Sequence, residues 1–451
     1  MMHYKWFTLL MCAAATACHT TSKTSTPVVK QVNEKAVSLN PEELNPGIPA
    51  YQATTVHYQR DGKKVLTVQL KEPIVLGVAD KVEKWGYFQF PHIDKMPDNS
   101  LRVRWNLNDD AMEAYGKHKF GQAISKDGIT WTAAEDSSPY TSIVLNNGER
   151  LSIHTPKPIR IDTIALPSPA HSPLATDTYS KSPYQYYRLH DLPESCQGIY
   201  FDRWLPGTKQ WKTEKAGLND PHAARNSLRG HIPIIWWGDI HQAKDGSLIA
   251  GVYPGFYVDE NNNALPKHNV FFYRSTDNGR NWNVQGRIFY EPDTITDKKA
   301  NSRMGFTEPA YTILADGTFI CVSRTTDGVG NGPMYISRSS DMGKTWSKPE
   351  LFMASGVLPR LLQLENGVTV MASGRPGVQL RFSDDGQGKV WTNAFEMMPW
   401  IDYKDAVSCG YTGLLATGPD RFLIVYSDFR FVTEEGTVRK AIKVREVIVN
   451  P

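Results

Sequence analysis

Several histidine, tyrosine, arginine and glutamate residues stand at positions where they could form one acid-base site. They are His92, His118, Tyr253, His268, Glu308 and Arg360. Histidine and tyrosine transfer protons, and the planar guanidinium of arginine binds carboxylate or sulfate groups. Such a set suits acid-base chemistry on an anionic substrate. Each residue alone also has an ordinary alternative: His92 could be a satisfied core histidine, Tyr253 a packing residue, and Glu308 the partner of an arginine.

A repeated segment with no chemistry of its own organises the chain around these residues. Ser339 to Trp346 reads Ser-Ser-Asp-Met-Gly-Lys-Thr-Trp, and related copies run from Ser275 to Trp282, from Ser125 to Trp131 and, in degenerate form, from Ser383 to Trp391. Asp caps a tight turn, Gly allows a positive φ, and Trp packs against a sheet. The segment therefore predicts a hairpin turn, and it resembles the Asp boxes of sialidases and related β-propellers.

The sequence around each copy predicts four short strands separated by turns, and no stretch beyond the first residues has a convincing helical period. We therefore expect an all-β fold, a single β-propeller with Asp-box hairpins. Six units follow Trp85, and strands at 54–58 and 65–70 are expected to complete a seventh blade with 440–449. In a propeller, loops before the innermost strand and between the second and third strands share a face, so the six candidate residues should converge there.

The N-terminal residues predict export. His3 and Lys5 precede an apolar stretch that ends at Ala15-Thr16-Ala17-Cys18. Residues 1–18 fit a signal peptide with a possible lipobox, 19–50 a tether and N-terminal extension, and 51–451 the propeller. We expect a secreted, periplasmic or outer-membrane-anchored protein, with lipid attachment at Cys18 and simple secretion both open.

Composition and cysteine content limit the partners and cofactors. The 451 residues are 40% hydrophobic, which allows a large core, and the net charge of +3 comes without a basic run that would indicate nucleic-acid binding. Outside the leader, Cys196, Cys321 and Cys409 are an odd number, so a paired disulfide framework does not explain them. We expect a monomer that needs no cofactor for its chemistry; a structural divalent metal is possible, and its ligands are unknown.

Four groups of residues carry a resemblance to a known enzyme family over nearly the whole mature chain. They are residues 85–91 (Trp-Gly-Tyr-Phe-Gln-Phe-Pro), 186–193, 202–204, and 236–240 with 251–256. With these segments the chain resembles the propeller-type ulvan lyases and the related rhamnosidases that act on rhamnosyl-glucuronate. The resemblance implies a polysaccharide lyase that cleaves ulvan, an acidic sulfated polysaccharide, by β-elimination at a uronic acid 4-linked to rhamnose.

The same resemblance implies roles for individual residues. Tyr187 and Arg203 have the spacing of the catalytic Tyr and Arg of such lyases, His92 and His118 correspond to their two histidines, and Tyr253 and His268 to substrate contacts. β-Elimination needs a neutralised carboxylate, a base for the C5 proton and an acid for the leaving oxygen. Arg203 would clamp the carboxylate, His118 or Tyr187 would take the proton, and Tyr187 would protonate the leaving oxygen. Alternatively, Arg203 is a surface residue stacked on Trp204.

Three other functions compete with the lyase. An α-L-rhamnosidase would use one N-terminal histidine, for which His57 and Gln52 are the candidate positions. A sialidase is disfavoured because no Arg-Ile-Pro segment precedes the first repeat. A surface propeller that binds glycans without cleaving them would share the same leader and fold. Endo or exo cleavage and the choice of glucuronate or iduronate stay open.

Overall fold

The computed structural model describes residues 32–33, 53–172, 182–326, 332–375, 377–398 and 411–451. In these ranges the regular structure is β-strand, interrupted by single 3-10 turns. These turns are η2 (Met112–Ala114), η3 (Ile161–Thr163), η4 (Leu189–Asp191), η5 (Glu194–Cys196) and η6 (Ala300–Ser302). The predicted all-β class is confirmed. In the described ranges no helix is long and apolar enough to cross a membrane. The leader, Cys18, the tether, Gln52 and Cys409 lie outside the described residues.

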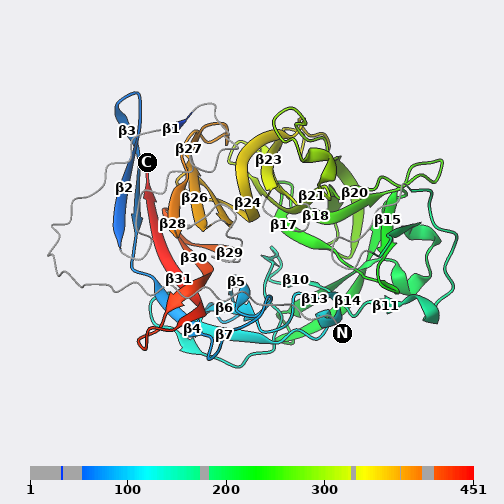
Figure 1. The fold of residues 1–451 in the computed structure, drawn as a ribbon, viewed down its shortest axis with the longest axis horizontal. Coiled ribbons are helices and arrows are strands. Elements are labelled where there is room, and N and C mark those ends of the chain that lie inside the picture. Colours follow the sequence, from blue (N-terminus) through cyan, green and yellow to red (C-terminus); the bar gives the residue numbers. More distant parts are fainter. Residues whose placement is uncertain (1–31, 34–52, 173–181, 327–331, 376, 399–410) are drawn as a thin grey trace, which may run out of the picture.

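The strands form antiparallel units that follow one another around a centre (Figure 1). Unit one holds β5 (Gln89–Lys95), β6 (Leu101–Asn106), β7 (Phe120–Ser125) and β8 (Thr132–Ala133), and unit two holds β9 (Ile143–Val144), β10 (Arg150–His154), β13 (Ile199–Leu205) and β14 (Gln210–Asn219). Unit three holds β17 (Trp237–Gln242), β18 (Leu248–Tyr257), β19 (Asn269–Ser275) and β20 (Asn281–Ile288).

The second half of the chain continues the same plan. Unit four holds β21 (Phe306–Ile313), β22 (Phe319–Thr325), β23 (Gly332–Ser339) and the first part of β24 (Glu350–Gln363). Unit five holds the rest of β24, β25 (Thr369–Gly374), β26 (Val378–Ser383) and β28 (Phe395–Met398), with β27 (Trp391–Thr392) paired to β1 (Val32–Asn33). Unit six holds β29 (Thr412–Gly418), β30 (Arg421–Val432) and β31 (Val438–Asn450).

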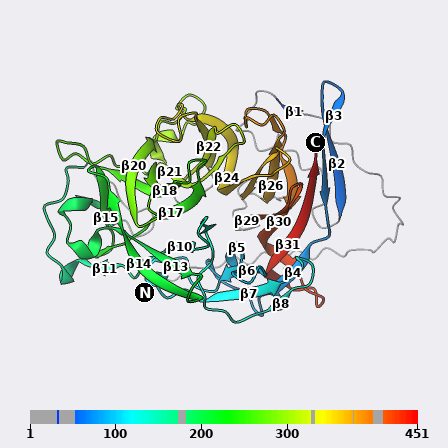
Figure 2. The ribbon, with the colours of Figure 1, turned by 180° about the vertical axis from the view of Figure 1, so that it is seen from behind.

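The N-terminal strands join unit six. These strands are β2 (Thr54–Arg60), β3 (Lys63–Leu70) and β4 (Ile74–Val78), and both β3 and β4 pair with β31. The strands β3 and β4 therefore share one sheet with the last strand of the chain, and the blue and red strands lie side by side in Figure 1 and, from behind, in Figure 2. The expected pairing with 440–449 is present, but in the described residues it extends the sixth unit instead of making a seventh.

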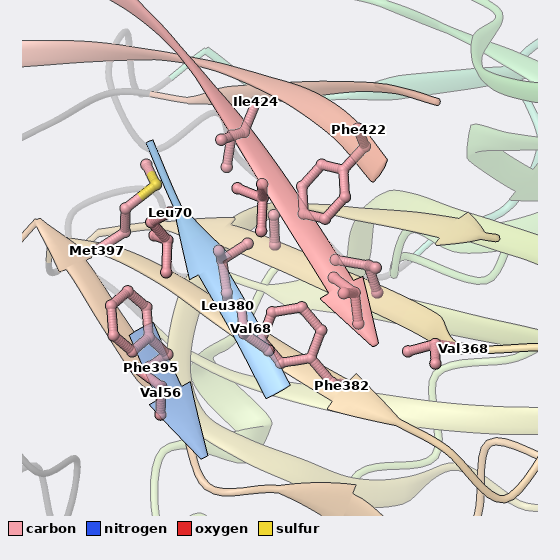
Figure 3. Packing of buried hydrophobic residues seen from close by; sticks show 14 of the residues in the cluster. Val56, Val68, Leu70, Val368, Leu380, Phe382, Phe395, Met397, Phe422 and Ile424 are labelled. Carbon is pink, nitrogen blue, oxygen red and sulfur yellow. The ribbon is translucent and has the colours of Figure 1, made fainter. Parts of the chain in front are cut away.

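Packing between units supplies the core. Val56 and Val68 of the N-terminal strands pack with Phe382 of unit five and Phe422 of unit six, and all four side chains are fully buried (Figure 3). Burial of a side chain of this size stabilises a fold by about 1.5–3 kcal/mol. The N-terminal strands thus hold units five and six together. This packing also fixes the inner strands of these units, β24 and β29.

Each of the four repeated segments forms a turn closed by the same hydrogen bonds. In all four, a Ser hydroxyl donates to the Asp carboxylate and the Trp indole N–H donates to a Gly carbonyl. In the copy around Asp341, this carboxylate also accepts the backbone N–H groups of Lys344 and Thr345. The residue types therefore predicted the turn correctly, and the turns do not belong to the lining of the central cavity described below.

Two insertions build an outer layer next to units two and three. β12 (Gln185–Arg188) pairs with β15 (Ala223–Ser227), which continues onto β18, and β11 (Ile159–Arg160) pairs with β16 (His231–Ile232). Tyr187 lies on β12, in this outer layer.

Candidate functional site

A central cavity of about 720 Å³ lies among the inner strands and the loops that lead into them. Its lining includes several titratable or aromatic side chains from different units: His92, Asp110, Tyr115, His118, Tyr140, Trp237, Asp239, His241, Tyr253, Glu308, Arg360 and Tyr411. A volume of this size is in the range of ligand-binding sites, and carbohydrate units could fill it.

Five of the predicted site residues meet in this cavity: His92, His118, Tyr253, Glu308 and Arg360. They come from units one, three, four and five and from the loop between β6 and β7. Of the six residues that strand order assigned to one face, only His268 is absent from this lining. Their roles in catalysis or substrate binding stay predictions.

Arg203 does not belong to the cavity. Its side chain is 1% exposed, and its guanidinium donates to Glu149 at 2.6 Å, to Glu214 at 2.7 Å and to the carbonyl of Asn278 at 2.8 Å. The reason is strand alternation, because Arg203 stands on the face of β13 that turns toward the repeated segment of unit three. The predicted carboxylate clamp is therefore wrong in its geometry: the group is already fully paired by the protein. The alternative of a surface arginine is wrong for the same reason.

Tyr187 and His268 also lie outside the cavity lining. Tyr187 is 3% exposed, packs with Leu192, Cys196 and Ile232, and donates its hydroxyl to Gln185 at 3.0 Å. It is a packing residue of the outer layer, so the predicted convergence of Tyr187 with His92 and His118 is not found. His268 stacks edge-on against Phe256 with ring centroids 5.1 Å apart, and burial lowers its pKa to about 4.

Tyr411 and Glu308 of the cavity lining belong to a tyrosine–glutamate–arginine cluster that the sequence-based assignment missed in part. The Tyr411 hydroxyl donates to Glu308 Oε1 at 3.3 Å and accepts from Arg375 at 3.2 Å. Glu308 is also held by Arg324 at 2.8 Å and by the backbone N–H of Leu358 at 2.8 Å. Tyr411 precedes an inner strand and carries no repeated motif, so only the predicted position of Glu308 pointed to this cluster.

Backbone bulges aim these side chains inward. Phe90, Glu308 and Leu358 have positive φ values of 53°, 47° and 41°, and each lies where the register shifts in the inner strand β5, β21 or β24. Non-glycine residues in this region cost of the order of 1–3 kcal/mol each and cluster at functional sites. The same bulge at three units therefore turns residues of β5, β21 and β24 toward the cavity.

Asp110 stands beside the cluster as a possible proton donor. It lies in the loop between β6 and β7, reaches the cavity, and accepts the indole N–H of Trp85 at 3.0 Å. Asp110 is solvent-exposed, but the protein around it partly desolvates the carboxyl group and raises its pKa, with Glu308 adding a further rise. Arg375 in turn lies 5.0 Å from the Trp85 ring, so Trp85 bridges the two charged groups.

Burial keeps the proton-transfer groups uncharged. Burial raises the pKa of Tyr411 and of Tyr253, with the charge of Glu308 adding to the rise in both. Burial lowers the pKa of His92 to about 4 and lowers that of His118. At neutral pH the cavity therefore presents neutral histidines and tyrosines, and its fixed charge resides on arginines and carboxylates.

In the described ranges, no group of three or more His, Cys, Asp or Glu residues is arranged to hold a metal ion. The possible structural divalent metal stays a prediction. Cys196 and Cys321 are both unpaired and buried, and burial raises the pKa of both thiols.

Comparisons with known proteins agree on the fold. Residues 206–415 match the BNR repeat-like domain. A protein of unknown function from Dyadobacter fermentans is 17% identical, covers 85% of this chain and 99% of its own, and superposes with a TM-score of 0.54. This likeness shows the fold alone.

Two enzymes are more distantly similar in structure. The Hadza microbial sialidase Hz136 is 13% identical with a TM-score of 0.44, covering 79% of this chain and 65% of its own. The α-L-arabinanase of Penicillium chrysogenum, complexed with arabinobiose, is 16% identical with a TM-score of 0.45, covering 83% of this chain and 98% of its own. No curated protein matches the sequence.

Proposed function

We propose that the protein is a carbohydrate-active enzyme that hydrolyses an anionic glycan in the central cavity, with Tyr411 as nucleophile. The observation that carries the proposal is the Tyr411 hydroxyl held between the Glu308 carboxylate and the Arg375 guanidinium. A tyrosine becomes nucleophilic when an adjacent base accepts its proton. Because tyrosine is neutral, it can approach an anionic sugar without the repulsion that a carboxylate nucleophile would meet.

The described residues supply each step of a two-step substitution. Tyr411 Oη attacks the anomeric carbon while Glu308 takes its proton, and Asp110 protonates the departing oxygen. Water then attacks the tyrosyl-linked sugar, Asp110 accepts a proton from that water, and the phenolic oxygen recovers its proton from Glu308. Arg324 and Arg375 stabilise the charge on Glu308 and on the departing phenolate. Two substitutions at one carbon retain its configuration.

A second candidate is the ulvan lyase that the sequence resembles. It is favoured by the neutral His92 and His118 in the cavity, because β-elimination needs an uncharged base for the C5 proton. In that reaction Arg360, which lines the cavity, would neutralise the uronate carboxylate in place of Arg203. An acidic sulfated polysaccharide outside the cell would fit either reaction and the expected export of the protein.

One assay separates the two reactions. Purified protein is incubated with ulvan and with other acidic polysaccharides while absorbance near 232 nm and new reducing ends are followed together. Hydrolysis gives reducing ends without absorbance, because elimination alone forms the conjugated uronate. Tyr411→Phe should abolish the hydrolysis, and Tyr187→Phe, which removes the same hydroxyl from the outer layer, is the matched control and should retain it.

The outcomes distinguish three functions. Rising absorbance that survives in Tyr411→Phe and is lost in His118→Asn would replace hydrolysis by elimination. Binding of the polysaccharide without either signal would make the protein a glycan-binding propeller. Equal loss of hydrolysis in Tyr187→Phe and Tyr411→Phe would contradict the assignment of the nucleophile.

A further inference from the structure

The reaction proposed above does not use a second wall of the cavity, which also carries charged side chains. Its central residue is Arg360, whose side chain is 26% exposed and lines the cavity. The guanidinium approaches Asp239 at 3.6 Å and donates to the carbonyl of Thr412 at 3.3 Å. Both contacts are longer than the 2.7–3.2 Å usual for such hydrogen bonds. Unlike Arg203, Arg360 therefore keeps binding capacity for a ligand.

Neighbouring side chains make this wall polar, and its lining also includes Asp94 and Asp239. The His92 ring lies 4.5 Å from that of Tyr140, and in the described part of the chain its buried Nε2 has no hydrogen-bond partner. Arg104 stands opposite His92 on β6; the charge of Asp94 acts on His92 most strongly, and the charges of Arg360 and Arg104 act in the opposite direction. A buried nitrogen without a partner costs about 1–3 kcal/mol, which a ligand hydroxyl or oxyanion would recover.

The position of Arg360 fixes where such a ligand would lie. It contacts the backbone of Thr412, the residue directly after Tyr411, so the wall adjoins the proposed reaction centre. Arg324 and Arg375 are committed to Glu308 and Tyr411 at that centre. A second anionic group on the same substrate would therefore meet Arg360.

We propose that Arg360, His92 and Tyr140 form a second subsite, which binds an anionic group on the sugar next to the one that reacts. The inference rests on the proposed function, because Tyr411 defines which sugar reacts. It names the substrate class as a glycan with charges on successive units. Arg360 binds the oxyanion, and His92 and Tyr140 contribute hydrogen bonds to it or to adjacent hydroxyls.

Binding is measured calorimetrically in a Tyr411→Phe background, so that turnover does not interfere. The probes are ulvan oligosaccharides in three forms: native, chemically desulfated, and carboxyl-reduced. Relative to the Tyr411→Phe parent, the added Arg360→Gln change should weaken binding of the native oligosaccharide at least tenfold. The same change should weaken binding of the form that lacks the recognised group less than twofold. That form identifies the group as sulfate or carboxylate. Arg360→Lys, which keeps the charge and loses the planar fork, should lie in between.

The control variant is Arg160→Gln, an exposed arginine that is absent from the cavity lining. It should bind all three probes like the Tyr411→Phe parent, and thermal melting verifies that every variant is folded. The subsite is refuted by equal loss for all three probes, by no loss in Arg360→Gln, or by a parent that binds none of them. If the binding pattern holds while wild-type protein produces no new reducing ends, the proposed hydrolysis has failed and the subsite has not.

Discussion

Replacing Arg203 with methionine tests whether this arginine serves the structure or the substrate. The substitution keeps an unbranched apolar stem and removes a guanidinium that is 1% exposed and bound by Glu149, Glu214 and the carbonyl of Asn278. Removing one partner of a buried ion pair usually costs about 3–5 kcal/mol, because the other charge is left uncompensated. Glu149 keeps a contact to Arg280 at 3.5 Å, and both carboxylates are partly exposed, so we expect the lower value, about 3 kcal/mol.

Urea denaturation followed by tryptophan fluorescence gives this free energy of unfolding, and turnover is measured below the transition on folded protein. Arg280→Met is the matched control, because Arg280 shares Glu149 but its side chain is 48% exposed, and such surface pairs contribute about 0–1 kcal/mol. Folded Arg203→Met should turn over substrate near the wild-type rate. Normal unfolding free energy together with lost turnover would refute the structural role and return Arg203 to the substrate.

Three further predictions follow from other parts of the molecule. Asp341→Ala should lower the free energy of unfolding by about 1 kcal/mol, through loss of a turn cap, with turnover of folded protein unchanged; a lost rate at unchanged stability would contradict this. Burial gives His268 a pKa of about 4 in the folded protein, against 6.5 in the unfolded chain, so the contribution of the neutral ring to stability is full above pH 6.5 and falls as the pH drops toward 4. His268→Asn should therefore make the free energy of unfolding less dependent on pH between 6.5 and 4. An unchanged pH dependence would contradict this prediction. Because partial desolvation raises the pKa of Asp110, its protonated form persists to higher pH, and kcat/KM should fall as the pH rises past that pKa. Asp110→Asn should remove this fall at alkaline pH. If the fall remains in Asp110→Asn, Asp110 is not the acid.

The fold was largely predictable because its signals are local. The Ser-x-Asp-x-Gly turns need only residues within eight positions, and their hydrogen bonds around Asp341 and Asp277 match the predicted cap. The arrangement of the N-terminal strands was harder. Their apolar pattern indicates strands, but pairing with β31 depends on packing against Phe382 and Phe422, which no local pattern specifies.

The site was predictable only where strand order determines direction. His92 and His118 reach the cavity because the start of an inner strand and the loop after β6 lie at the same end of a unit. Arg203 lies within a strand, where a shift of one position reverses the side chain, and spacing from Tyr187 does not reveal that direction. A resemblance in spacing therefore could not separate a catalytic arginine from a buried structural one.

Tyr411 and Glu308 show why the sequence predicted the proposed reaction centre only in part. They are far apart in the chain, and their contact depends on the bulge that gives Glu308 a φ of 47°. Without the bulge, a regular strand would direct alternate residues to the two faces of the sheet instead of placing Glu308 against Arg324 and Tyr411. The strain at this residue is sustained by the surrounding ion pair and hydrogen bonds. The proposed chemistry of the cavity therefore depends on several units together, since in the described part of the chain Tyr411, Glu308 and Asp110 come from different units.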